Sequence, residues 1–235
     1  GGSSRVLHMI GQSMSGRLLF LLLSSPGVLG GCLYTPDGNG HVTVPDGVVE
    51  LAANAFNGCS TLVSITLPDG LASLGANVFE GCTSLVSITL PDSLTSLGQA
   101  AFFQCTSLVN ITLPDGLASL GYATFYGCSS LVSITLPDGM ASIENEVFSW
   151  CSALVSVTLP DGLASLGNSA FNGCTSLASI TLPDSLTSIG LYVFWGCTSL
   201  ALVYVPTGCD VGTDAFKNTA APSPGWAYAV ANPDS

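Results

Sequence analysis

The chain has 235 residues and a formal net charge of −12, because fifteen Asp or Glu residues stand against three Lys or Arg residues. Only 8% of the residues are charged, whereas an ordinary soluble domain has about 25%. Nucleic acids and anionic membrane surfaces both attract rows of cations. The composition therefore argues against both partners and predicts a surface built largely of Ser, Thr, Asn and Gly.

Residues 1–31 lie outside the repeats described below and resemble a secretory signal peptide or an N-terminal extension. Arg17 precedes the apolar run of residues 18–23, and a Pro-Gly break and small residues follow it. Six apolar residues are too few to span a bilayer. Residues 29–32, which end at Cys32, are also similar to a bacterial lipobox, in which the cysteine is acylated. The alternatives are export, a lipid anchor at Cys32, and a retained segment that covers the end of the repeats.

A strict 23-residue period governs the chain from residue 39 onward. The phrase Leu-Val-Ser-Ile-Thr-Leu-Pro-Asp fills residues 85–92, and close copies begin at Leu62, Leu108, Leu131, Leu154 and Leu177. A constant period between 20 and 50 residues is the signature of a solenoid, in which each coil packs only on its neighbours. The sequence therefore predicts one continuous stack of coils.

Each coil contains one pattern that is typical of a half-buried strand. In the phrase, Ile88 and Leu90 alternate with polar residues, and Pro91 then ends the strand because it lacks an N–H. Strands that recur in one direction pair in parallel about 4.8 Å apart. Equivalent residues should then form ladders, among them one phenylalanine per coil from Phe56 to Phe194. On the opposite wall, the next leucines fit a short extended or helical turn.

The same spacing resembles the BspA-like leucine-rich repeat, a class with 23-residue repeats. One unit reads Leu-x-x-Ile-x-Leu-Pro-x-x-Leu-x-x-Leu over residues 85–97 and continues with Ala-Phe-x-x-Cys-x-x-Leu over residues 101–108. The resemblance covers about residues 39–216. It implies a right-handed, horseshoe-like solenoid with a parallel β-sheet on the concave side and short extended, 3₁₀ or helical turns on the convex side. It also implies a secreted or surface protein, often an adhesion module, with no shared catalytic residues.

We expect three segments: residues 1–31 as a signal peptide or extension, residues 32–217 as the solenoid, and residues 218–235 as a Pro/Ala-rich linker and tail. The first and last coils are irregular, as capping coils usually are. In the last coil, Cys209 and Gly212 stand where leucines are expected, and Lys217 takes the place of the phenylalanine.

Metal and catalytic chemistry find little support in the sequence. Seven cysteines occur once per coil, at Cys59, Cys82, Cys105, Cys128, Cys151, Cys174 and Cys197. That spacing predicts packing residues rather than metal ligands. One aspartate per coil follows each proline and fits turn chemistry better than a Ca²⁺ site. The only histidines are His8 and His41, and neither has a serine–acid partner that the spacing indicates. We therefore expect a non-enzymatic protein without a cofactor or metal.

Candidate ligand-binding residues fall into two sets. The first is a Ser-x-Thr lattice on the strands, at Ser64, Thr66, Ser87, Thr89, Asn110, Thr112, Ser133, Thr135, Ser156, Thr158, Ser179 and Thr181. The second is a set of aromatic residues that follow the phenylalanines, at Phe103, Tyr126 and Trp195. Both sets have a structural alternative, because threonines stabilise strands and aromatic rings can simply cover adjacent coils.

The sequence favours a secreted or cell-surface binding or adhesion module that recognises a protein or glycan partner. One alternative is a repetitive Ser-x-Thr lattice that binds ice or a polymer, since the pattern is similar to the Thr-x-Thr arrays of ice-binding β-solenoids. The other alternative is an ectodomain fragment of a larger receptor. Membrane attachment is expected only through the possible lipid anchor at Cys32. The sequence leaves the oligomeric state open.

Overall fold

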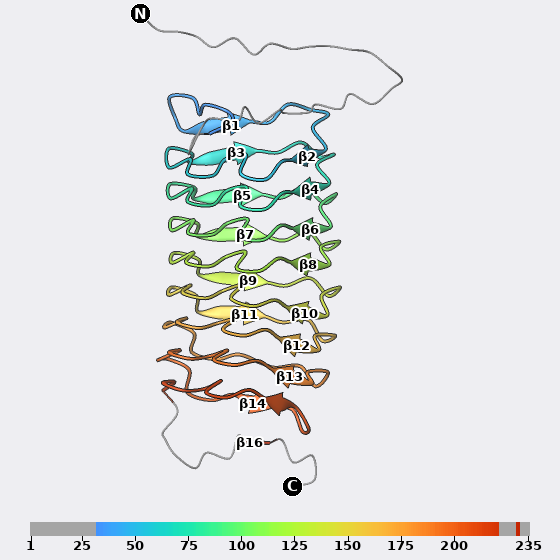
Figure 1. Ribbon diagram of the computed structural model, residues 1–235, viewed down its shortest axis with the longest axis vertical. Coiled ribbons are helices and arrows are strands. Elements are labelled where there is room, and N and C mark those ends of the chain that lie inside the picture. The colour runs from blue at the N-terminus through green and yellow to red at the C-terminus, as the bar shows by residue number, and fades with distance from the viewer. Residues whose placement is uncertain (1–31, 221–228, 231–235) are drawn as a thin grey trace, which may run out of the picture.

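The computed structural model describes residues 32–220 and 229–230 and shows a stack of coils (Figure 1). We count the coils from residue 39, so that they begin at residues 39, 62, 85, 108, 131, 154, 177 and 200. Each coil passes along three walls that enclose a single apolar core. The described part of the chain contains strands and turns but no helix.

The first wall carries the predicted strands, whose polar residues alternate with a buried Ile or Val. They are β1 (His41–Thr43), β3 (Ser64–Thr66), β5 (Ser87–Thr89), β7 (Asn110–Thr112), β9 (Ser133–Thr135) and β11 (Ser156–Thr158). Hydrogen-bonded parallel pairs form between β1 and β3, β5 and β7, and β9 and β11. The pairs lie one above another in Figure 1. The predicted parallel stacking is confirmed.

The second wall is also extended, which is one of the forms that the sequence left open. Its two-residue strands are β2 (Glu50–Leu51), β4 (Ser73–Leu74), β6 (Ser96–Leu97), β8 (Ser119–Leu120), β10 (Ser142–Ile143), β12 (Ser165–Leu166), β13 (Ser188–Ile189) and β15 (Asp210–Val211). They form two four-stranded parallel sheets, β2-β4-β6-β8 and β10-β12-β13-β15. The ladder is therefore interrupted once, between β8 and β10.

The third wall consists of tight turns, one per coil, that carry the phenylalanine and the cysteine into the core. Each turn starts at a residue with a positive φ, such as Asn77 or Ala100. Backbone hydrogen bonds join successive turns; for example, the Phe79 N–H donates to the Ala101 carbonyl at 2.8 Å. The phenylalanine rings stack at centroid distances of 5.3–5.6 Å from Phe56 to Phe194. The predicted phenylalanine ladder is confirmed.

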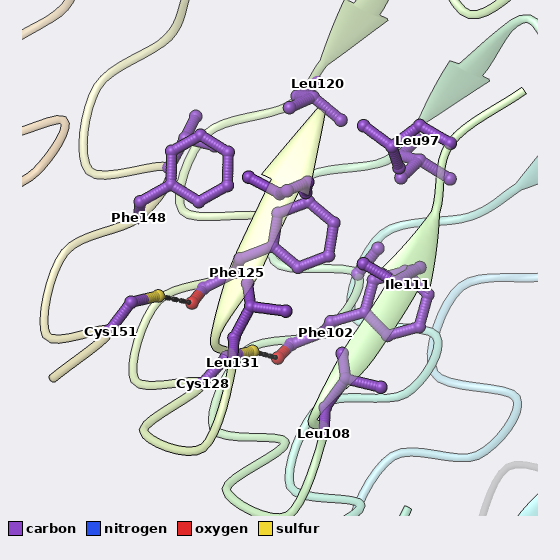
Figure 2. Packing of buried hydrophobic residues seen from close by; sticks show 14 of the residues in the cluster. Leu97, Phe102, Leu108, Ile111, Leu120, Phe125, Cys128, Leu131, Phe148 and Cys151 are labelled. Carbon is purple, nitrogen blue, oxygen red and sulfur yellow. Dashed lines mark hydrogen bonds between the residues drawn. The ribbon is translucent and has the colours of Figure 1, made fainter. Parts of the chain in front are cut away.

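The cysteines from Cys82 to Cys197 are buried free thiols that pack beside the phenylalanines. Each thiol donates to the carbonyl of the phenylalanine in the preceding coil, as Cys128 does to Phe102 at 3.2 Å (Figure 2). Burial raises the pKa of the Cys82 and Cys151 thiols to about 12. The predicted packing role is confirmed for these six cysteines, and the bond to the carbonyl explains why a thiol is used rather than an alkyl group.

At the N-terminal end, residues before the first coil pack on the core, which includes the buried Cys59. Cys59, the first member of the row, is bonded to Cys32 in a disulfide rather than being a free thiol. In this structure the Cys32 sulfur lies in that disulfide, whereas a lipid thioether needs a free Cys32 thiol, and the anchor stays a prediction. The Leu33 N–H donates to the Ala55 carbonyl, and the Tyr34 ring stacks on Phe56. Residues 32–34 thus extend the core by part of a coil. The expectations for residues 1–31 lie outside the described residues.

The C-terminal end corrects the predicted register. Ile189 pairs with Val211, so that Val211 fills the leucine position and Gly212 fills a glycine position. The last coil is therefore one residue shorter, and Phe216 rather than Lys217 continues the ring stack, 5.1 Å from Phe194. Within the predicted tail, β16 (Ala229–Val230) pairs in parallel with β14 (Tyr204–Val205).

Candidate interaction surfaces

The first wall presents the predicted Ser-x-Thr lattice on its outer side. Ser64 is half-buried, and the other eleven predicted residues of this set are exposed. Paired strands hold equivalent residues side by side, with Thr89 opposite Thr112 and Thr135 opposite Thr158. The hydroxyls therefore form a grid with one row per coil, about 4.8 Å apart.

A row of exposed valines, which the sequence reasoning missed, borders this grid. Val63, Val86, Val132 and Val155 each precede a first-wall strand and are exposed. The recurring Leu-Val-Ser was the available signal, since only one of the two apolar residues can point inward. Between β7 and β9, the wall also has a shallow depression of about 490 Å³, lined among others by Asn110, Thr112, Asp115, Ser133 and Thr135. The face thus combines hydroxyl groups with methyl groups.

His41 occupies the serine row of the lattice in the first coil. Its Nδ1 shares a hydrogen bond of 2.8 Å with the Ser64 hydroxyl, and its Nε2 lies 3.2 Å from the Thr43 hydroxyl and 3.3 Å from that of Thr66. The side-chain partners of the imidazole are therefore hydroxyls, and no carboxylate in the described chain orients it as in a serine–histidine–acid triad.

The predicted aromatic residues lie on the third wall, away from the lattice. Phe103, Tyr126 and Trp195 are half-buried. The Phe103 and Tyr126 rings stack on each other with centroids 4.7 Å apart and an interplanar angle of 6°. In the first two coils the same positions hold Asn57 and Glu80, which are joined by a hydrogen bond of 3.1 Å. In both cases the side chains contact the next coil, so this pair of rings covers the stack.

The described residues contain no group of three His, Cys, Asp or Glu side chains that could hold a metal ion. The aspartates that follow the prolines, such as Asp69 and Asp92, are exposed on turns. Within the described part of the chain, no helix has the length and apolar character needed to cross a membrane.

The stacked parallel coils define a leucine-rich-repeat solenoid, and the comparisons with known proteins assign the family. The chain belongs to the BspA-type leucine-rich repeat family, whose repeat model matches residues 38–138 and 119–223 in six copies. No curated protein sequence matches the chain significantly.

Three solved structures illustrate the likeness. A T. pallidum leucine-rich repeat protein is 31% identical over 76% of this chain and 75% of its own, with a TM-score of 0.55. A Bacteroides ovatus protein is 28% identical over 76% of this chain and 61% of its own, with a TM-score of 0.53. A Eubacterium ventriosum protein is 26% identical over 70% of this chain and 45% of its own, with a TM-score of 0.63.

Proposed function

We propose that the protein is a non-enzymatic, secreted or cell-surface binding module that recognises a protein or glycan partner through the first wall. The observation that carries the proposal is the open outer side of this wall. In four coils an exposed valine lies next to the Ser-x-Thr residues of the same coil. Such a surface offers both hydrogen-bonding groups and apolar area to an elongated partner.

Two further observations support export. The Cys32–Cys59 disulfide suits an oxidising compartment, because cytosolic thiols are normally kept reduced. The signal-like pattern of residues 1–31 points in the same direction. Membership of a family whose proteins are often found at surfaces agrees with both.

Arrays of matrix proteins and glycans, probed with the full chain, test this function. Binding should be lost in Thr112→Arg, which places a long charged side chain in the middle of the first wall. Thr95→Arg is the matched control, because Thr95 is an exposed threonine near the second-wall strand β6. If no array member binds, or if both variants lose binding equally, the first-wall proposal is wrong.

A lattice that binds ice or a repetitive polymer is the second candidate. The regular register of the first wall favours it, since Ser87 faces Asn110 and Thr89 faces Thr112 in successive coils. The first and second walls both carry parallel strands, so the distance between neighbouring coils is similar on both walls. This limits the curvature of the stack, and a flat lattice match needs low curvature. Thermal hysteresis and ice-recrystallisation assays check this candidate. Ice-binding activity that Thr112→Arg abolishes would support this candidate. A complete lack of activity in both assays would show that the protein does not bind ice.

A further inference from the structure

The fifth coil, residues 131–153, departs from the repeat at one corner and lacks a backbone hydrogen bond there. In the other coils from the second onward, a glycine follows the second-wall strand, and a side chain would collide with the preceding coil. A Cβ at Gly121 would lie 2.5 Å from the backbone nitrogen of Gln99, and one at Gly167 would lie 2.6 Å from that of Asn145. In the fifth coil this corner is Glu144.

The ladder breaks at this corner. The Gly121 N–H donates to the Leu97 carbonyl at 3.0 Å, and the Gly167 N–H donates to the Ile143 carbonyl at 2.8 Å. In the described structure the Glu144 N–H makes no equivalent bond to Leu120, and the second-wall sheet divides there, between β8 and β10. The glycine corners of the other coils all make this backbone hydrogen bond to the preceding coil. The corner at Glu144 lacks it.

A second departure lies on the next turn of the same coil. Trp150 has a positive φ of 62°, at a position where most other coils have a glycine. Its indole ring extends over Gly173 of the next coil, where an added Cβ would lie 3.0 Å from the indole Cε3. The absence of a side chain at Gly173 thus makes room for the ring. Trp150 nevertheless remains 48% exposed, so this arrangement holds a large aromatic surface toward solvent.

Neighbouring groups complete the surface and supply mainly hydrogen-bond acceptors. Tyr122 is 42% exposed, and hydrogen bonding with the nearby Glu146 carboxylate raises the pKa of Tyr122. The turn that begins at Glu146 leads directly to Trp150, since the Ser149 N–H donates to the Glu146 carbonyl at 3.1 Å. Beside Trp150, the buried Oδ1 of Asn172 accepts no hydrogen bond from the described residues.

The charge of this surface is uncompensated within the described chain. Lys217 is the only Lys or Arg among the described residues, and it pairs with Asp214 at 3.1 Å in the last coil. Glu144 and Glu146 therefore have no basic partner in the described structure. A partner that brings positive charge would meet two carboxylates and an exposed indole within residues 144–150 of one coil.

We propose that Tyr122, Glu144, Glu146 and Trp150 form a docking site for an arginine-bearing segment of a partner protein. A guanidinium group is flat and carries five N–H donors, so it can stack on the indole while it donates to the carboxylates. A glycan fits less well, because sugar hydroxyls also need donors and the carboxylates of Glu144 and Glu146 are acceptors only. The site lies on the second and third walls and does not depend on the first-wall function.

Titration of the full chain with a capped peptide of alternating glycine and arginine tests the site, with tryptophan fluorescence and calorimetry at low salt. The same peptide with citrulline in place of arginine is the ligand control. Trp150→Gln should weaken binding by about five- to tenfold, and Glu144→Gln with Glu146→Gln by about tenfold. Gln104 holds the equivalent position of Trp150 at a φ of 54°, so the glutamine suits this backbone.

Two matched protein controls separate the site from general attraction to an acidic chain. Tyr192→Ala removes another exposed aromatic residue, at a position where Ala100 and Ala123 have the same positive φ. Asp69→Asn with Asp92→Asn removes two exposed carboxylates elsewhere. Neither change should weaken binding by more than about twofold. Equal losses in the controls, or equal binding of the citrulline peptide, would overturn the proposal. So would a Trp150-dependent glycan signal without arginine binding.

Discussion

The corners at Gly121 and Glu144 occupy the same place in the fourth and fifth coils, yet only the first keeps the second-wall ladder. At Gly121 the missing side chain lets the two backbones approach, and the N–H reaches Leu97. At Glu144 a carboxylate extends to the surface and the inter-coil hydrogen bond is absent. On the third wall the ladder continues through both coils, since the Phe125 N–H donates to the Val147 carbonyl.

The difference shows that one wall of a solenoid can change while the others hold the coil in place. Each coil is tied to its neighbours by three separate sets of contacts, so the loss of one hydrogen bond does not unstack the array. A departure that costs stability and also places unusual side chains at the surface is a stronger indication of function than a departure that costs nothing.

The largest expected effect tests whether the core packs equally well on both sides of the interrupted second-wall ladder. Phe125→Ala and Phe148→Ala should each lower the free energy of unfolding by about 3–5 kcal/mol, because each opens a large cavity in a fully buried stack. The two losses should agree within about 1 kcal/mol, since the ring distances on either side of Phe148, 5.6 and 5.3 Å, match the rest of the ladder. Urea denaturation measures both. A much smaller loss for Phe148→Ala would mean that the fifth coil is also loosened in its core.

A pair of alanine substitutions tests the corners directly. Gly121→Ala should destabilise the fold by about 2–3 kcal/mol, because the new Cβ collides with the Gln99 backbone rather than with a movable side chain. Glu144→Ala should change stability by less than about 0.5 kcal/mol, since the chain there already accommodates a Cβ. The same denaturation curves measure the pair. If Gly121→Ala is as well tolerated as Glu144→Ala, the glycine row does not set the spacing of the second wall.

The ladders of equivalent residues could be predicted from the sequence. The period placed Phe125, Cys128 and Thr135 on ladders, because a residue that recurs every 23 positions must lie beside its copies. The sequence left the form of the second wall open, since two leucines three residues apart fit an extended segment or a helical turn equally well.

The irregular parts could not be predicted from the repeat period. Cys59 belongs to the cysteine row by phase, but its sulfur has no preceding phenylalanine carbonyl to bind and instead meets Cys32. By phase Phe216 comes one residue early, and only the pairing of Ile189 with Val211 shows where the last coil is one residue shorter. The corner at Glu144 gave no such signal, because the collision that a Cβ makes at the equivalent glycine corners cannot be seen in a linear pattern.

Hydrogen exchange sharpens the comparison at the level of one amide. In the native protein, the Glu144 N–H should exchange much faster than those of Gly121 and Gly167, which are bonded to the neighbouring coil. Glu144→Gly should slow exchange at residue 144 toward its glycine counterparts and change the overall stability by no more than about 1 kcal/mol. Exchange followed by NMR resolves these amides. An already protected Glu144 N–H would contradict the broken ladder.

The smallest expected effect is on the pKa of Tyr122, which follows the corner at Gly121 and interacts with Glu146 of the next coil. The hydrogen bond to Glu146 raises the pKa of Tyr122, because deprotonation breaks that bond and adds a second negative charge beside the carboxylate. The stability from this bond is fully present below the unfolded tyrosine pKa of about 10 and is lost as the pH rises through the folded pKa. Glu146→Gln should return the Tyr122 pKa toward its ordinary value, and Glu144→Gln should leave it raised. Carbon-13 NMR titration of the tyrosine rings distinguishes the variants, and an unchanged Tyr122 pKa in Glu146→Gln would separate Tyr122 from the acidic corner.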